Sequence, residues 1–137
     1  MEIGFASVPP RPGLSATVSM QVTDDDTACA FHSGDVEVLA TPRVVALAEE
    51  ASIKAIDGSL EKGNTTVGYR VQFDHLAPIV PGATVQAEAT LEAVEGKRLV
   101  FRVPHYKTDA ALKEEWETKL YAKTLPVMPG APQVVPQ

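Results

Sequence analysis

The sequence predicts an α+β domain in which one central helix packs on a curved antiparallel sheet. Two observations carry this prediction. One segment, residues 41–57, has the start and stop signals of a helix. After it, apolar residues recur at every second position over much of the remaining chain, a pattern typical of half-buried strands. A lone helix followed by successive strands favours a helix-on-sheet architecture.

The 137-residue chain is long enough to bury a core and, with 45% apolar residues, is most simply one domain. Its two ends are rich in proline. We expect residues 1–14 to be an extended segment, residues 15–123 to form the folded domain, and residues 124–137 to be a tail. Its prolines can sustain neither a helix nor a central strand, so the tail is expected to be an extended arm or a disordered end.

Composition argues against several classes of function. The formal net charge of −6 argues against nucleic acid as a partner, because phosphate binding needs a concentrated basic surface. No apolar run approaches the ~20 residues that span a bilayer, and "MEIGFASVPPRPG" lacks the features of a signal peptide. Cys29, the only cysteine, cannot form an internal disulfide, so we expect a cytoplasmic protein. The spacings of histidine and cysteine match no zinc pattern, and no metal is expected.

The first strand is predicted over "SATVSMQVT", residues 15–23, where apolar and polar side chains alternate. Three aspartates, Asp24 to Asp26, end it. The stretch "TACAF", residues 27–31, is predicted as a short strand that leads into the loop "HSGDVE".

The helix is predicted to begin at Thr41 as its N-cap, with Pro42 at the favoured first position. Asp57-Gly58 ends it after about four turns. At about 100° per residue, small residues fill the centre of its apolar stripe, so another element can approach the helix closely. The centre of the stripe consists of Val44, Ala48, Ala51 and Ala55, flanked by Val45, Leu47 and Ser52.

Two adjacent glutamates interrupt this helix. Glu50 projects away from the stripe, four residues before Lys54, and is predicted to lie on the surface. Glu49 lies at the edge of the stripe, where a carboxylate either reaches solvent or faces a site. The residues alone favour the plain readings for three candidates: Glu49 as an edge residue that reaches solvent, Thr41 as an N-cap, and His75 as a structural histidine. A role in a site stays open for each of them.

Further strands are predicted after the helix. Residues 67–73 alternate up to His75, with Val67, Tyr69, Val71 and Phe73 in one phase. Residues 83–93 alternate strictly, and Glu95-Gly96 forms a tight turn into residues 99–103, which predicts a hairpin. The segment "ALKEEWETKLYAK", residues 111–123, is ambiguous: its propensities favour a helix, yet its apolar residues also fall on one face of a strand.

Three stretches, "LATPRVVALAEEA", "VGYRVQFDHLAPIVPG" and "VEGKRLVFRV", resemble the hot-dog-fold thioesterases of the fluoroacetyl-CoA thioesterase type. Those enzymes have a threonine that opens the central helix, a glutamate eight residues later and a histidine 26 residues beyond. Thr41, Glu49 and His75 keep both intervals, and Gly68 keeps the glycine seven residues before the histidine. The resemblance spans residues 15–123.

The resemblance implies a hot-dog fold, in which one long central helix is wrapped by a curved antiparallel sheet. It implies a homodimer with active sites at the dimer interface, and it leaves open whether dimers pair into a tetramer. It also implies that residues 111–123 form a strand, and we follow it over the helical propensity. Lys119 falls where the fluoroacetyl enzyme has an arginine.

The function implied by the resemblance is hydrolysis of a small acyl-CoA to a free acid and coenzyme A, with no cofactor apart from the coenzyme A of the substrate. The catalytic candidates are Thr41, Glu49 and His75, and Gly68 lets substrate approach the strand backbone. Cations are needed for the coenzyme A phosphates. The candidates for them are Arg43, Arg70, Lys97, Arg98 and Lys119.

Two alternatives stay open. One is a non-catalytic protein that binds an acyl-CoA or another small ligand in the same cleft. The other is a hot-dog hydratase or dehydratase acting on an enoyl thioester, although "HSGD", residues 32–35, is not followed by that branch's asparagine and histidine. The stretch "SGDVEVLAT" also lacks the phenylalanines that gate the fluoroacetyl enzyme, so selection of a fluorinated acyl group is not expected.

Overall fold

The computed structural model describes residues 9–74, 78–103, 106–108, 113–114 and 118–126. In this part of the chain, the helix α1 (Thr41–Ala55) packs against an antiparallel sheet and follows a short 3-10 turn, η1 (Asp24–Asp26). The strands of the sheet are β1 (Ser15–Gln21), β2 (Asn64–Phe73), β3 (Thr84–Glu95), β4 (Arg98–Val103), β5 (Tyr106–Thr108), β6 (Lys113–Glu114) and β7 (Thr118–Pro126).

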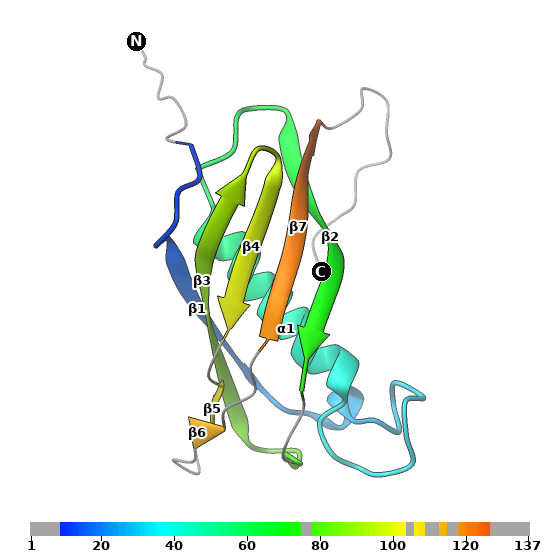
Figure 1. Ribbon diagram of the computed structural model, residues 1–137. Helices are drawn as coiled ribbons and strands as arrows, with labels where there is room; N and C mark the ends of the chain where they lie inside the picture. Colours follow the sequence, from blue (N-terminus) through cyan, green and yellow to red (C-terminus); the bar gives the residue numbers. More distant parts are fainter. Residues whose placement is uncertain (1–8, 75–77, 104–105, 109–112, 115–117, 127–137) are drawn as a thin grey trace.

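The long strands lie in the order β1-β3-β4-β7-β2, and every pairing is antiparallel. β5 pairs with β3 beyond the end of β4, and β6 pairs with β5. The sheet curls around α1, which lies against one face of it (Figure 1). The predicted architecture, one central helix wrapped by a curved antiparallel sheet, is confirmed. So is the predicted hairpin, in which Glu95 lies opposite Arg98 and Gly96 takes a positive φ of 63°.

The helix begins one residue earlier than predicted. Ala40, and not Thr41, is its N-cap, with an extended backbone at φ −72° and ψ 139°. The Ala40 N–H donates to the Asp26 carbonyl at 2.8 Å, which holds Ala40 outside the helix. Thr41 is therefore the first helical residue, and Pro42 lies in the first turn, where its missing N–H costs nothing.

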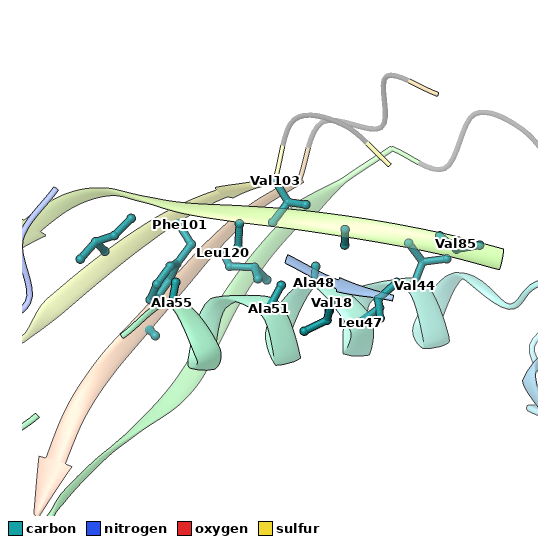
Figure 2. Close-up of a cluster of buried hydrophobic side chains, with 14 of the residues drawn as sticks. Val18, Val44, Leu47, Ala48, Ala51, Ala55, Val85, Phe101, Val103 and Leu120 are labelled. Atoms are coloured by element: carbon teal, nitrogen blue, oxygen red, sulfur yellow. The ribbon is translucent and has the colours of Figure 1, made fainter. Parts of the chain in front are cut away.

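The core lies between the small-residue face of α1 and the concave face of the sheet (Figure 2). The predicted stripe is confirmed, because Val44, Ala48, Ala51 and Ala55 are all buried. Across from it, inward-facing strand residues fill the space, and Phe101 of β4 is the largest fully buried side chain. Because the stripe is rich in alanine, the inward side chains of the strands pack directly against the helix.

Strand β2 contains a β-bulge that the sequence pattern hides. Gly68 pairs with Ala122 and Arg70 with Tyr121, so Tyr69 is an extra residue.

The bulge changes which side chains of β2 face the core, because residues paired directly across strands share a face. Val67, opposite Lys123, therefore faces outward, whereas Val71, opposite Leu120, faces inward. The predicted single apolar face of β2 is wrong, because the bulge changes the phase at Gly68, a residue type that often marks bulges.

The ambiguous segment 111–123 is a strand wherever it is described, as the family resemblance implied and helical propensity did not. β6 covers Lys113–Glu114, and in β7 Leu120 is buried while Lys119 and Lys123 alternate with buried neighbours. Trp116 lies outside the described residues. β7 continues to Pro126, opposite Asn64, which is three residues beyond the predicted end of the domain.

The short strand predicted over residues 27–31 is wrong. Thr27 forms only an isolated bridge with Leu39. The chain then turns back on itself, because the Phe31 N–H donates to the Thr27 carbonyl and the Ser33 N–H to the Ala28 carbonyl. Hydrogen bonds within such turns use the backbone N–H and C=O groups that residues 27–31 would need for pairing with a neighbouring strand.

The 15-residue helix α1 is too short to cross a bilayer, and the described residues contain no helix that could do so.

The close packing of α1 on the sheet predicts a position-specific response to a larger side chain. Ala48 is fully buried and Ala46 is exposed on the same helix. Leucine and alanine are both strong helix formers, so Ala48→Leu changes mainly the packing. We expect Ala48→Leu to lower the free energy of unfolding in urea by about 1–3 kcal/mol. Ala46→Leu is the matched control, and an equal loss in both variants would contradict a close-packed helix face.

Candidate active site

A groove lies between α1 and the β2 edge of the sheet. It is open to solvent on one side and has a cavity volume of about 40 Å³, and its floor is made by inward-facing residues of β4 and β7. The residues that line it are Glu49, Ser52, Ile53, Thr66, Gly68, Phe101, Leu120, Tyr121 and Ala122. Most of these side chains are apolar, and among those lining the groove only Glu49 carries a charge.

The Glu49 carboxylate lies directly against Gly68. A Cβ placed on Gly68 would be 2.9 Å from Glu49 Oε2, which is closer than real Cβ atoms come to other atoms. Glu49 itself is half-buried, whereas Glu50, the next residue, is exposed as predicted. The structure thus brings together two residues that the sequence analysis singled out: Glu49, at the edge of the helix stripe, and Gly68, which the family resemblance named.

Ser52 was predicted to flank the helix stripe, but its place in the groove was not predicted, and neither was the apolar floor. Ser52 lies one turn after Glu49, is buried, and donates its hydroxyl to the Ala48 carbonyl at 2.8 Å. Phe101 and Leu120 face the helix from β4 and β7 and are buried. The three-residue interval from Glu49 to Ser52 was a usable signal, since residues three apart share a helix face. The floor depends on how β4 and β7 pair, which no local pattern shows.

Thr41 lies at the other end of the helix from this groove. It is the first residue of α1 and is exposed. Eight residues separate it from Glu49, which corresponds to about 12 Å along the helix axis at about 1.5 Å per residue. Side chains of this size do not bridge such a distance, so Thr41 and Glu49 of one chain do not meet at one atom.

The first turn of α1 offers fewer donors for an oxyanion than a helix start usually does. The N–H groups of Arg43 and Val44 both donate to the Ala40 carbonyl, at 3.0 and 3.1 Å. Pro42 has no N–H. The predicted capping role of Thr41 is wrong, because the bond from Ala40 to Asp26 moves the cap one residue back and places Thr41 inside the helix.

Arg43 is engaged with an acidic partner. Its Nε lies 3.2 Å from Asp26 Oδ1, and both side chains are mostly buried. The other carboxylate oxygen of Asp26 accepts bonds from the N–H and the hydroxyl of Thr23, at 2.8 and 3.0 Å. This cluster ties η1 to the first turn of α1. It positions the start of the helix. It also pairs Arg43, one of the cations expected to bind coenzyme A, with the carboxylate of Asp26.

Arg70 and Lys119 lie on the outer face of the sheet, opposite to the face that lines the groove. The Arg70 guanidinium lies 4.9 Å from the centre of the Tyr121 ring, a cation–π distance. Lys119 Nζ lies 3.2 Å from Glu92 Oε1, and both of these side chains are about 40% exposed. Neither cation reaches Glu49 within one chain, because the sheet lies between them.

His75, the third catalytic candidate, lies outside the described residues. The strand that leads to it, β2, ends at Phe73, whose side chain packs against the core. The Pro81-Gly82 pair after it forms a turn in which Gly82 has a positive φ of 98°.

Known proteins share both the sequence and the fold. Residues 22–114 match the family of fluoroacetyl-CoA-specific thioesterases, FlK. The fluoroacetyl-CoA thioesterase of Streptantibioticus cattleyicolor is 42% identical over 67 residues, which is 49% of this chain and 48% of that enzyme. The match to this curated relative therefore spans about half of its length.

Solved structures extend the likeness over most of the chain. A FlK threonine-to-serine mutant in complex with acetyl-CoA is 27% identical, with a TM-score of 0.78 over 86% of this chain and 91% of that one. A hot-dog-like protein from Thermanaerovibrio acidaminovorans is 21% identical, with a TM-score of 0.73 over 84% and 83% of the two chains. At that identity the second likeness establishes the fold alone, which is the hot-dog fold.

The helix-wrapping sheet, the glutamate seated in the groove and the match over residues 22–114 agree with one another. The chain belongs to the fluoroacetyl-CoA-specific thioesterase family.

Proposed function

We propose that this protein hydrolyses small acyl-CoA thioesters to a free acid and coenzyme A. The observation that carries the proposal is the position of the Glu49 carboxylate, which is the charged group in an otherwise largely apolar groove and lies against Gly68. A carboxylate held at such a place can activate water or attack a carbonyl carbon. Membership of a thioesterase family supports the same reaction.

The proposed chemistry needs three operations. An oxygen, from a Glu49-activated water or from Glu49 itself, adds to the thioester carbonyl carbon. The resulting tetrahedral oxyanion collapses, the carbon–sulfur bond breaks, and the thiolate of coenzyme A takes up a proton. If Glu49 attacks, the products are an enzyme-bound anhydride and free thiol, and a water then releases the acid. We propose His75 as the proton donor to sulfur, since an imidazole titrates near neutrality.

We propose that each site combines residues of two subunits. Thr41 and Glu49 of one chain lie about 12 Å apart along α1, so a site that uses both needs the Thr41 of a second copy. Strand β2 supports this assembly, because it lies at one end of the strand order among the described residues and pairs there with β7. Its apolar side chains Val67, Tyr69 and Val71 are 46%, 52% and 39% exposed. A twofold pairing of β2 strands would cover this edge.

The proposed dimer also gives a role to the cations on the outer face. Arg70 and Lys119 lie on β2 and the neighbouring β7, close to the edge where a second copy would pair. A coenzyme A whose thioester lies at Glu49 would leave the groove at this edge. We propose that Arg70 and Lys119 bind its phosphates through their charged N–H groups. Arg43, at the helix start, would join them only by exchanging its ion pair with Asp26 for a phosphate.

The acyl group is proposed to be small. The curated relative is a fluoroacetyl-CoA thioesterase, and a FlK structure contains acetyl-CoA. Selection of fluorine does not belong to the proposal, because residues 33–41 lack phenylalanine. A second hollow continues past Ile53 and Thr66 toward Gly58, so longer acyl chains are compared directly with short ones below.

We also propose a cytoplasmic location, which the single cysteine supports.

A panel of acyl-CoAs tests the reaction class. We expect release of free thiol from acetyl-CoA and other short acyl-CoAs, measured with a thiol reagent, and slower release from long and aryl acyl-CoAs. Crotonyl-CoA, followed by its enoyl absorbance, serves as the comparison substrate for a hydratase. Loss of the enoyl chromophore without thiol release would indicate a hydratase, and binding without either change would indicate a binding protein. Both results contradict the proposal.

The two adjacent glutamates provide a matched pair of variants. Glu49 lies in the groove and Glu50 is exposed. We expect Glu49→Gln to lower kcat by about 100-fold or more, the range for loss of a general base. Glu50→Gln should leave kcat within about twofold, as expected for a surface change. A Glu49→Gln enzyme with near-normal kcat would overturn the assignment even if the activity itself is confirmed.

Mixing two inactive variants tests the composite site. Thr41→Ala and Glu49→Gln homodimers should each lose most activity. After the two are unfolded and refolded together, about half of the dimers are mixed, and each mixed dimer holds one intact site if Thr41 and Glu49 come from different chains. About a quarter of wild-type activity should return, by the statistics of a symmetric dimer. No recovery would place the site within one chain.

A second mixture serves as the control for this experiment. A Thr41→Ala/Glu49→Gln double variant is refolded with an equal amount of wild-type chain. If the site is composite, the mixed dimers have no intact site, and about a quarter of the activity remains, from wild-type homodimers alone. If both residues act within one chain, each mixed dimer keeps one site and about half of the activity remains.

A further inference from the structure

We infer that Gly68 is a positioning residue for the Glu49 carboxylate. The space above the Gly68 backbone, which we call the seat, receives this carboxylate, and the bulge of β2 at Tyr69 holds that backbone in place. The inference rests on the proposed role of Glu49 in hydrolysis. It assigns to Gly68 a function that differs from direct contact with substrate: the absence of a side chain at Gly68 determines where the carboxylate of Glu49 lies.

The backbone at Gly68 does not require glycine. Five other glycines of the described chain have a positive φ, between 63° and 101°, where other residues are strained. Gly68 lies within strand β2 and is not one of them. A glycine inside a strand weakens it and offers no side chain to pack. The reason for glycine at this position is therefore the space above it.

That space is occupied by Glu49. The nearest atom to a Cβ built on Gly68 is Glu49 Oε2 at 2.9 Å, and the next is the Tyr121 backbone oxygen at 4.0 Å. A methyl group at this position would therefore meet the carboxylate before it met any other group. Because the carboxylate is the far end of a flexible side chain, it would move aside while the backbone stayed in place.

The strand itself cannot easily yield, because the bulge beside Gly68 is held from the other face of the sheet. The Tyr69 and Tyr121 rings lie 6.2 Å apart, and the Arg70 guanidinium lies 4.9 Å from the Tyr121 ring. Two successive residues of the bulge thus contact one tyrosine of β7. Gly68 remains paired with Ala122 on the inner side. These contacts favour movement of the Glu49 side chain over movement of the β2 backbone.

The substitution Gly68→Ala tests this seat. We expect kcat to fall by about 100-fold, since a displacement near 1 Å of a reacting group has an effect of that size. KM should change by less than about threefold, because uniform binding of the substrate is retained. The melting temperature should change by less than about 4 °C, the shift that corresponds to a small stability change in a domain of this size. Gly34→Ala is the matched control, because its new methyl group meets Ala28 Cβ at 3.3 Å instead of Glu49.

A double-variant cycle separates positioning from general damage. In a Glu49→Gln background, Gly68→Ala should lower the residual kcat by less than about twofold, because the group it displaces no longer acts. Equal losses in both backgrounds would show that Gly68 acts through something other than Glu49. A Gly68→Ala enzyme with normal kcat and KM would also overturn the inference.

A measurement without substrate keeps the inference separate from the proposed function. The side-chain carboxyl carbon of Glu49, assigned by its loss in Glu49→Gln, should shift in the NMR spectrum of Gly68→Ala and not in that of Gly34→Ala. If no acyl-CoA of the panel releases thiol but this resonance moves, the result supports the inference about Gly68 and contradicts the hydrolase proposal. If hydrolysis is observed and the resonance does not move, the seat is wrong and the hydrolase proposal stands.

Discussion

The close approach of α1 to the concave face of the sheet is the constraint on which the rest of the structure depends. Ala48 and Ala51 are fully buried at the contact, so little more than methyl groups separates the helix from the strands. This proximity buries the stripe and closes the core around Phe101. It also brings the edge of the helix, with Glu49, against β2. A bulkier helix face would hold the carboxylate away from the strand where Gly68 receives it.

At the β2–β7 edge, the inner face of the sheet lines the groove and the outer face carries the cations. Its inner face contributes Gly68, Leu120 and Ala122 to the groove. Its outer face carries Arg70, stacked on Tyr121, and Lys119, paired with Glu92. The bulge at Tyr69 connects the two, because contacts on the outer side fix the backbone that forms the seat on the inner side. An edge strand with exposed valines and a tyrosine, next to these cations, suits an assembly in which two copies share one substrate.

Sequence patterns predicted the parts of this molecule that follow local rules. The helix stripe, the hairpin at Gly96 and the surface position of Glu50 depend on residues close in the chain, and the structure agrees with all three. The bulge at Tyr69 and the N-cap at Ala40 were missed, because each is set by a bond to a distant segment. The strand within residues 111–123 needed the family resemblance, since the local propensity of that segment favours a helix. The contact between Glu49 and Gly68 joins residues 19 apart in sequence, and only the packing of α1 on β2 brings them together.

The central claim is that the Glu49 carboxylate in the groove between α1 and β2 is where the thioester reacts. A crystal structure of the protein with an acetyl-CoA analogue, in which a methylene group replaces the thioester sulfur, tests it most directly. We expect the carbonyl carbon of the analogue to lie within about 3.5 Å of a Glu49 carboxylate oxygen or of a water bound to it, the distance of a near-attack arrangement. A carbonyl group bound outside this groove, with Glu49 turned away from it, would contradict the claim.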